Sequence, residues 1–143
     1  DGVMQALTDA GVPSPERGIR LDARRRGVDV VTRELLLGDE PATAIIASDS
    51  LIAMTVFQTI RTLGLRIPED VSLIAFDNAD WTGITTPPLT VVGQPIYELG
   101  AAAARLALQR IHGERVDDES VVFDAALIRR ASVAAPTPIP ADS

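Results

Sequence analysis

Residues 43–77 constrain the fold more than any other stretch of this chain. They begin with TAIIA, a short apolar run with β-branched residues, which is typical of a buried strand. The pair Asp49-Ser50 then stands where a helix N-cap is needed, a helical pattern covers residues 51–63, and Gly64 suits the position after a helix. Residues 71–76 form a second apolar run. This order predicts a βαβ unit with parallel strands and a right-handed crossover.

A carboxylate follows each of these two strands. Asp49 comes after the first strand, and Asp77 comes directly after the second. In parallel sheets, ligands bind beyond the carboxyl ends of the strands. Either residue alone could be a helix cap or a turn residue, but two acids on successive strand ends indicate a binding site.

The rest of the chain continues the alternation of helices and strands. Apolar spacing predicts helices over residues 1–11, 23–37 and 97–111, and strands over 19–21, 89–92, 121–123 and 126–128. Residues 78–88 have no regular period and end in Pro-Pro, which predicts a loop. The pattern indicates an α/β fold with a Rossmann-like parallel sheet flanked by helices. Few residues follow helix 97–111, so we expect it to belong to a second, incomplete subdomain.

The composition excludes several kinds of site. The chain has no cysteine and a single histidine, His112, which exclude a cysteine-bound metal and a histidine-rich metal centre; we expect no cofactor. A net charge of −7 and an aromatic content of 3% make this chain a poor nucleic-acid binder by itself. No apolar run is long enough to span a bilayer and no signal peptide is visible, so we expect a cytoplasmic protein without a membrane partner.

The helix predicted over residues 51–63 carries two stripes. Helix geometry of about 100° per residue predicts a core face made of Ile52, Val56, Ile60 and Leu63. A second stripe at helical spacing consists of Met54, Phe57, Gln58 and Arg61. Other parts of the same domain could cover this stripe. Alternatively, Met and Phe rimmed by Gln and Arg suit the core and rim of a symmetric dimer interface.

Four segments carry a family resemblance. They are, in chain order, TAIIASDSLIAMTVFQTIRTLGLRIPEDVSLIAFDN, TPPLTVVGQP, YELGAAAARLAL and ALIRRAS. Together they resemble the effector-binding domain of the lactose/galactose-repressor (LacI/GalR) family of bacterial transcription regulators. The resemblance implies a periplasmic-binding-protein-like fold of type I, with two Rossmann-like subdomains, a ligand cleft between them, and three crossovers of the chain.

This resemblance also implies how the chain divides. Residues 1–92 would form the C-terminal effector-binding subdomain, and residues 93–125 an excursion into the mostly missing N-terminal subdomain. Residues 126–135 would return to the C-terminal subdomain, and residues 136–143 would be a flexible tail. The helix-turn-helix that binds DNA in this family would lie outside this chain.

Individual residues acquire expected roles from the same resemblance. Asp77 matches a strand-end Asp that hydrogen-bonds ligand hydroxyls, and Asp49 falls where the family usually has Asn, also a ligand contact. Ser50 falls where the family has the Asp that caps the helix. Asp22 falls where many sugar-responsive members place an aromatic side chain against the ligand, although it could also be a solvated loop acid. Trp81 lies in a loop near the site, where it could either pack under the loop or touch ligand. These four expected ligand contacts are Asp77, Asp49, Asp22 and Trp81.

The remaining expected roles concern the dimer and the hinge. The second stripe of the central helix matches the family's dimer-contact positions, so the resemblance favours the interface for Met54, Phe57, Gln58 and Arg61. Gln94 would lie at a crossover, where we expect it to form hydrogen bonds rather than to touch ligand.

Three classes of function are compatible with this fold. The first is the ligand-sensing and dimerisation module of a DNA-binding regulator, which takes a sugar or polyol between two subdomains. The second is a periplasmic sugar-binding protein of the same fold, which should lack PPLTVVGQP and PEDVSLIAFDN. The third is an enzyme that uses paired carboxylates. A phosphate-binding Gly-rich motif, a nucleophile elbow and a metal cluster are all missing from the sequence, so we expect no enzyme.

Overall fold

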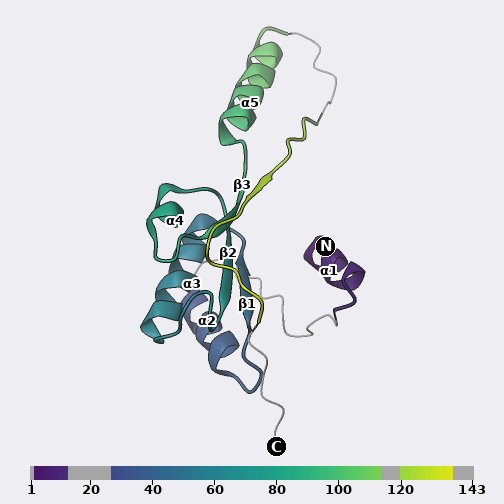
Figure 1. Ribbon diagram of the computed structural model, residues 1–143. Helices are drawn as coiled ribbons and strands as arrows, with labels where there is room; N and C mark the ends of the chain where they lie inside the picture. Colours follow the sequence, from purple (N-terminus) through teal and green to yellow (C-terminus); the bar gives the residue numbers. More distant parts are fainter. Residues whose placement is uncertain (1, 13–26, 114–119, 137–143) are drawn as a thin grey trace, which may run out of the picture.

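The computed structural model describes residues 2–12, 27–113 and 120–136 (Figure 1). Its elements, in chain order, are α1 (Gly2–Asp9), α2 (Val28–Leu37), β1 (Ala44–Ala47), α3 (Ser50–Thr62), β2 (Ser72–Phe76), α4 (Asp80–Ile84), β3 (Thr90–Gly93), α5 (Ile96–Ile111) and β4 (Ala126–Ile128). The strand expected over residues 19–21 lies outside the described residues. Within the described ranges, no helix combines the length and the apolar character that crossing a membrane requires.

The four strands form one sheet in the order β1-β2-β3-β4. Strands β1, β2 and β3 are parallel, and β4 runs antiparallel to β3. Helix α3 connects β1 to β2 and packs against both, and α2 packs against α3 on the same side of the sheet (Figure 1). The predicted βαβ unit and the α/β class are therefore confirmed.

The core lies between this sheet and α3. Ile60 is fully buried and Val56 nearly so, as the predicted core stripe requires, while Ile52 and Leu63 are partly buried against the same cluster. From the sheet, the buried apolar side chains are Leu73, Ala75 and Val91 together with Ala47. The burial of these apolar side chains is the main contribution that favours folding in a domain of this kind.

Several expected boundaries are wrong. Helix α2 begins at Val28, because its N-cap Gly27 has a φ of 83°, a left-handed conformation that an α-helix cannot continue through. Residues 23–26 of the helix expected over 23–37 lie outside the described residues. The loop expected over 78–88 contains the short helix α4, whose five residues are too few to show a helical period. No strand forms over 121–123.

Helix α5 stands apart from the sheet. Figure 1 shows it beyond the end of β3, joined to the body by β3 and by the segment that leads into β4. Ala102 is its only buried residue, and Ile96, Tyr97 and Ile111 are each at least 75% exposed. An Ala/Leu-rich helix with this much exposed apolar surface fits the expectation that its packing partner is not part of the described chain.

The segment after β4 crosses the start of β3 to reach β2. Ser132 is fully buried there, and its hydroxyl donates to the Leu73 carbonyl and accepts from the Thr90 backbone N–H at 2.8 Å. The backbone N–H of Leu73 donates to the Ser132 carbonyl at 2.9 Å. One serine thus satisfies backbone groups of both β2 and β3.

We expect Ser132→Ala to lower the free energy of unfolding by about 1–3 kcal/mol, because it leaves the Thr90 N–H and one acceptor of Leu73 buried without the hydroxyl. Urea denaturation measures this. Val133→Ala, at a 45% exposed neighbour, is the control and should change stability by less. Equal effects for the two variants would contradict the bridging role of the hydroxyl.

An ion pair closes the loop before β2. The Arg66 guanidinium donates to both carboxylate oxygens of Asp70, at 3.0 Å and 2.9 Å, and the Arg66 backbone N–H donates to Asp70 Oδ2 at 2.8 Å. The side-chain hydrogen bond and then the backbone one lower the pKa of Asp70 from 3.8 to about 2.

Because the pKa of Asp70 is lower in the folded protein than in the unfolded chain, its ionised carboxylate stabilises the fold above pH 3.8. This contribution is lost as the pH falls from 3.8 through about 2. We therefore expect Asp70→Asn to be slightly less stable than the parent at neutral pH, and the difference to vanish at the acid end. The effect is small because the pair is exposed. Urea midpoints of both proteins across this pH range test it, and a difference that grows towards low pH would contradict it.

Candidate functional site

Asp77 stands at the carboxyl end of β2 in an unusual backbone conformation. Its φ is 70°, and it is the only described non-glycine residue with a positive φ. Asp tolerates this left-handed region better than most residues, but it still carries a cost that is often found at functional positions. The Asp77 backbone N–H donates to the Val92 carbonyl at 2.9 Å. Gln94 Nε2 donates to its carboxylate Oδ1 at 2.8 Å.

Asp49 lies at the same edge of the sheet. Ala47 pairs with Ala75 in the parallel register, and each of the two acids follows its paired alanine by two residues. Asp49 is the N-cap of α3, where its Oδ1 accepts from the backbone N–H groups of the second and third residues after it, at 2.8 Å and 2.9 Å. The expected cap at this strand end is confirmed, and it is Asp49 rather than Ser50.

Ser50 instead connects α3 to α4. Its hydroxyl oxygen accepts from the Trp81 indole Nε1 at 3.0 Å. The Trp81 ring is tilted by 59° against the Phe57 ring, with centroids 6.4 Å apart. Trp81 is therefore half-buried over α3, next to the strand-end edge and next to the second stripe of that helix. The position of Trp81 in a loop did not predict these contacts with α3.

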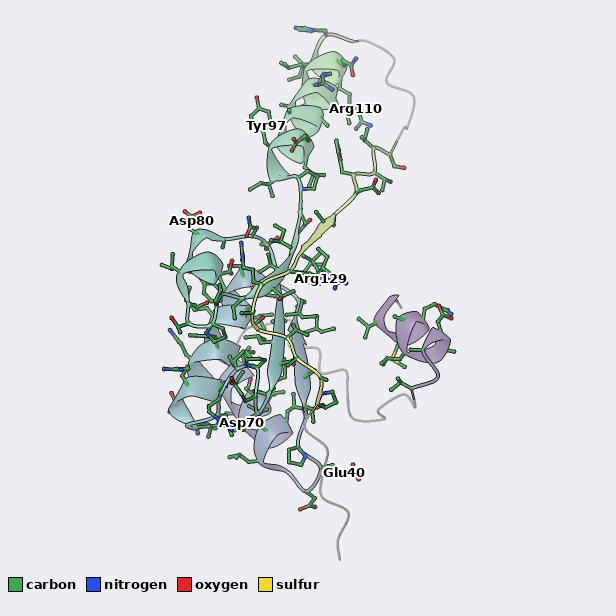
Figure 2. The ribbon with its side chains drawn as sticks, in the orientation of Figure 1. Glu40, Asp70, Asp80, Tyr97, Arg110 and Arg129 are labelled. Atoms are coloured by element: carbon green, nitrogen blue, oxygen red, sulfur yellow. The ribbon has the colours of Figure 1, made fainter. Side chains whose placement is uncertain are left out.

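Arg130 organises the turn after β2, and the sequence pattern does not distinguish it from Arg129. Its Nη2 donates to Asn78 Oδ1 at 2.6 Å, and its Nη1 donates to the Leu89 carbonyl at 2.8 Å and to Thr82 Oγ1 at 3.1 Å. Thr82 is fully buried. The segment ALIRRAS contains two arginines, and only the structure separates Arg130 from its exposed neighbour Arg129, which Figure 2 labels.

The second stripe of α3 is only partly open. Gln58 and Arg61 are exposed, whereas Met54 and Phe57 are half-buried, and Phe57 packs against the core. The stripe therefore combines exposed polar side chains with apolar side chains that are already half-buried within the chain itself. Asp22, the remaining expected ligand contact, lies outside the described residues.

A depression of about 520 Å³ opens at the other edge of the sheet. It lies near the amino ends of β1 and β2, between Thr43, Ser72 and the Arg66–Asp70 pair. Figure 2 shows the separation, with Asp70 near one end of the body and Asp80 near the end from which α5 projects. The strand-end acids are therefore not part of this depression.

The parallel strands β1 and β2 are each followed by a carboxylate, beside the segments that connect the sheet to α5. This is the end of an α/β sheet at which ligands bind. Comparison with known sequences agrees, because the profile of the periplasmic binding protein-like domain matches residues 1–133. The chain is 38% identical over 135 residues to the "Probable opine utilization operon repressor" of Rhizobium rhizogenes, covering 93% of this chain and 68% of that protein. It is 35% identical to the HTH-type transcriptional repressor CytR of Escherichia coli K12, covering 94% of this chain and 40% of CytR.

A solved structure gives the same assignment. The LacI family transcriptional regulator from Enterococcus faecium, with bound ribose, superposes with a TM-score of 0.79 at 32% identity, over 93% of this chain and 49% of that one. The chain belongs to the LacI/GalR family of transcription regulators. It spans about half the length of this solved relative, and the two curated relatives above are named as repressors.

Proposed function

We propose that this chain is the ligand-sensing and dimerisation module of a bacterial LacI-type DNA-binding regulator. The observation that carries the proposal is Asp77, an acid held in a left-handed conformation at a strand end, with its carboxylate hydrogen-bonded to Gln94 at the root of a crossover. A carboxylate has about four acceptor positions, so it can bind the hydroxyl groups of a sugar or polyol while it accepts from Gln94.

The proposed effector site is the strand-end edge that Asp77 and Asp49 share, with Trp81 beside it and Asp22 as a further contact. Residues 1–92 would supply this half of the cleft, residues 93–125 would visit the N-terminal subdomain, residues 126–135 would return, and residues 136–143 would form a tail. The ribose bound to the Enterococcus faecium relative supports a sugar as the ligand class. DNA would be bound by a helix-turn-helix outside this chain.

We also propose that this regulator works in the cytoplasm and is not an enzyme. The relatives that are named as repressors support both points. They also favour the regulator over a periplasmic sugar-binding protein of the same fold.

A thermal-stability screen of the full-length regulator against sugars and polyols tests the effector. The panel should include an opine, because the relative from Rhizobium rhizogenes is named for an opine operon. A ligand present at 100 times its Kd stabilises the folded state by about 2.7 kcal/mol, which shifts the Tm measurably. A ligand that raises the Tm should also change the affinity for operator DNA. Absence of any stabilising sugar, polyol or opine would contradict the proposal.

We also propose that the second stripe of α3, with Met54, Phe57, Gln58 and Arg61, is the interface of a homodimer. Gln58→Glu should weaken the dimer, because a two-fold interface places two new carboxylates in the same desolvated region. Ala6→Glu on exposed α1 adds the same charge elsewhere and is the control. Sedimentation equilibrium measures the dimer constant, and an unchanged constant for Gln58→Glu would place the interface on another surface.

A further inference from the structure

Both crossovers reach the sheet beside the turn that follows β2. Strand β3 runs outward to Gln94 and α5, and β4 returns along it in antiparallel register, with Gly93 opposite Ala126 and Val91 opposite Ile128. Figure 1 shows these two segments as the connection between α5 and the body. A change in the direction of α5 relative to the sheet must therefore act through this pair.

Each crossover holds one of two consecutive side chains in that turn. Gln94, directly after β3, donates to the Asp77 carboxylate at 2.8 Å. Arg130, two residues after β4, donates to Asn78 Oδ1 at 2.6 Å. Neighbouring side chains also pack closely around Gly93, because a Cβ added there would lie 3.1 Å from Ile128 Cδ1 and 3.6 Å from Asn78 Cβ.

The two bonds come from opposite directions of the chain but meet on neighbouring residues. Arg130 is further fixed by the Leu89 carbonyl and by buried Thr82, so its guanidinium is a rigid donor. Gln94 is exposed and depends on the crossover for its position. Asp77 is thus oriented by a side chain that belongs to the part of the molecule that leaves the sheet.

We propose that Gln94 and Arg130 are positioning residues that form a two-point clasp. Gln94 orients the Asp77 carboxylate, Arg130 holds the neighbouring Asn78, and together they set the direction of both crossovers. The clasp rests on the proposed function only in taking Asp77 as an effector contact. A carboxylate that is oriented before the ligand arrives loses less freedom on binding. Because the same carboxylate is tied to a crossover, effector contact and crossover direction are linked through one residue.

The clasp is tested without an effector, in the 143-residue chain described above. The chain has no cysteine, so spin labels go on Arg33→Cys in α2 and Ala104→Cys in α5, both exposed. Double electron–electron resonance then reports the distribution of distances between the body and α5. The doubly labelled chain is measured without further change and with Gln94→Met, Arg130→Met or both substitutions added. Arg129→Met, at the exposed neighbour, is the matched control.

We expect Gln94→Met to lower the ratio of the parent distance to other distances roughly 5-fold, the effect of losing one hydrogen bond. Arg130→Met should lower it at least as much, and Arg129→Met should leave it unchanged. Trp81 is the chain's single tryptophan, and its emission shows whether the body stays folded. Gln94→Met should alter the distances with unchanged emission, which a merely structural defect would not do.

Unchanged distances in both Gln94→Met and the double variant would overturn the clasp. If Arg130→Met fails to fold, Gln94→Met alone decides, because its side chain is exposed. The distance measurement is independent of the ligand screen. A screen without hits would contradict the proposed effector binding, whereas the distance data alone decide whether the clasp exists.

Discussion

Asp77→Ala in the full-length regulator is expected to weaken effector binding by about 10- to 100-fold, because hydrogen bonds to a charged acceptor contribute about 1.5–3 kcal/mol. Asp77→Asn should lose less, since asparagine also tolerates a positive φ and its carbonyl can still accept from Gln94. Isothermal titration calorimetry with the ligand found in the stability screen measures both.

Asp80→Asn is the matched control for this series. Asp80 is an exposed acid three residues further on, at the start of α4, and Figure 2 shows it at the outer surface of that helix. Its replacement removes the same charge and should leave the affinity unchanged. If Asp77→Ala and Asp80→Asn behave alike, the strand-end carboxylate is not an effector contact.

Ile60→Ala is expected to lower the free energy of unfolding by about 2–5 kcal/mol, the range for removing a fully buried aliphatic side chain. Ile60 has no exposed surface and lies where α3 packs on β1 and β2, so little can collapse into the space. Urea denaturation at one fixed chain concentration measures the loss, because a dimer makes apparent stability depend on concentration.

Arg61→Ala supplies the comparison one residue away. Arg61 is exposed, and a substitution there should change monomer stability by no more than about 0.5 kcal/mol. The effect of Arg61→Ala should appear instead in the dissociation constant of the proposed homodimer. Similar losses for the two variants would mean that the two stripes of α3 do not have separate roles.

Most of the central βαβ unit was predictable, because its signals are local. An apolar run, a capping Asp, a helical period and Gly64, with its φ of 74°, each act within a few residues. The parallel register then follows from the crossover rule, and with it the common edge for Asp49 and Asp77. Helix α4 escaped prediction because it is held by Trp81 and buried Thr82 rather than by a periodic pattern of its own.

The contacts around the candidate site were not predictable, because they join residues far apart in the chain. Gln94 meets Asp77 across 17 positions, Trp81 meets Ser50 across 31, and Arg130 meets Asn78 across 52. No local rule selects Arg130 over Arg129 as the residue that turns inward. That choice depends on the antiparallel pairing of β4 with β3, which exists only once the chain has folded.

The sequence by itself determined the α/β class, the strand-end acids and the two stripes of the central helix, because propensity, capping and periodicity are properties of neighbouring residues. Only the tertiary structure decided which side chains hold the Asp77–Asn78 turn, that Ser132 bridges β2 and β3, and that Trp81 lies over α3. Those outcomes are set by which distant segments pack together, and the hydrogen bonds form where packing brings donors to acceptors.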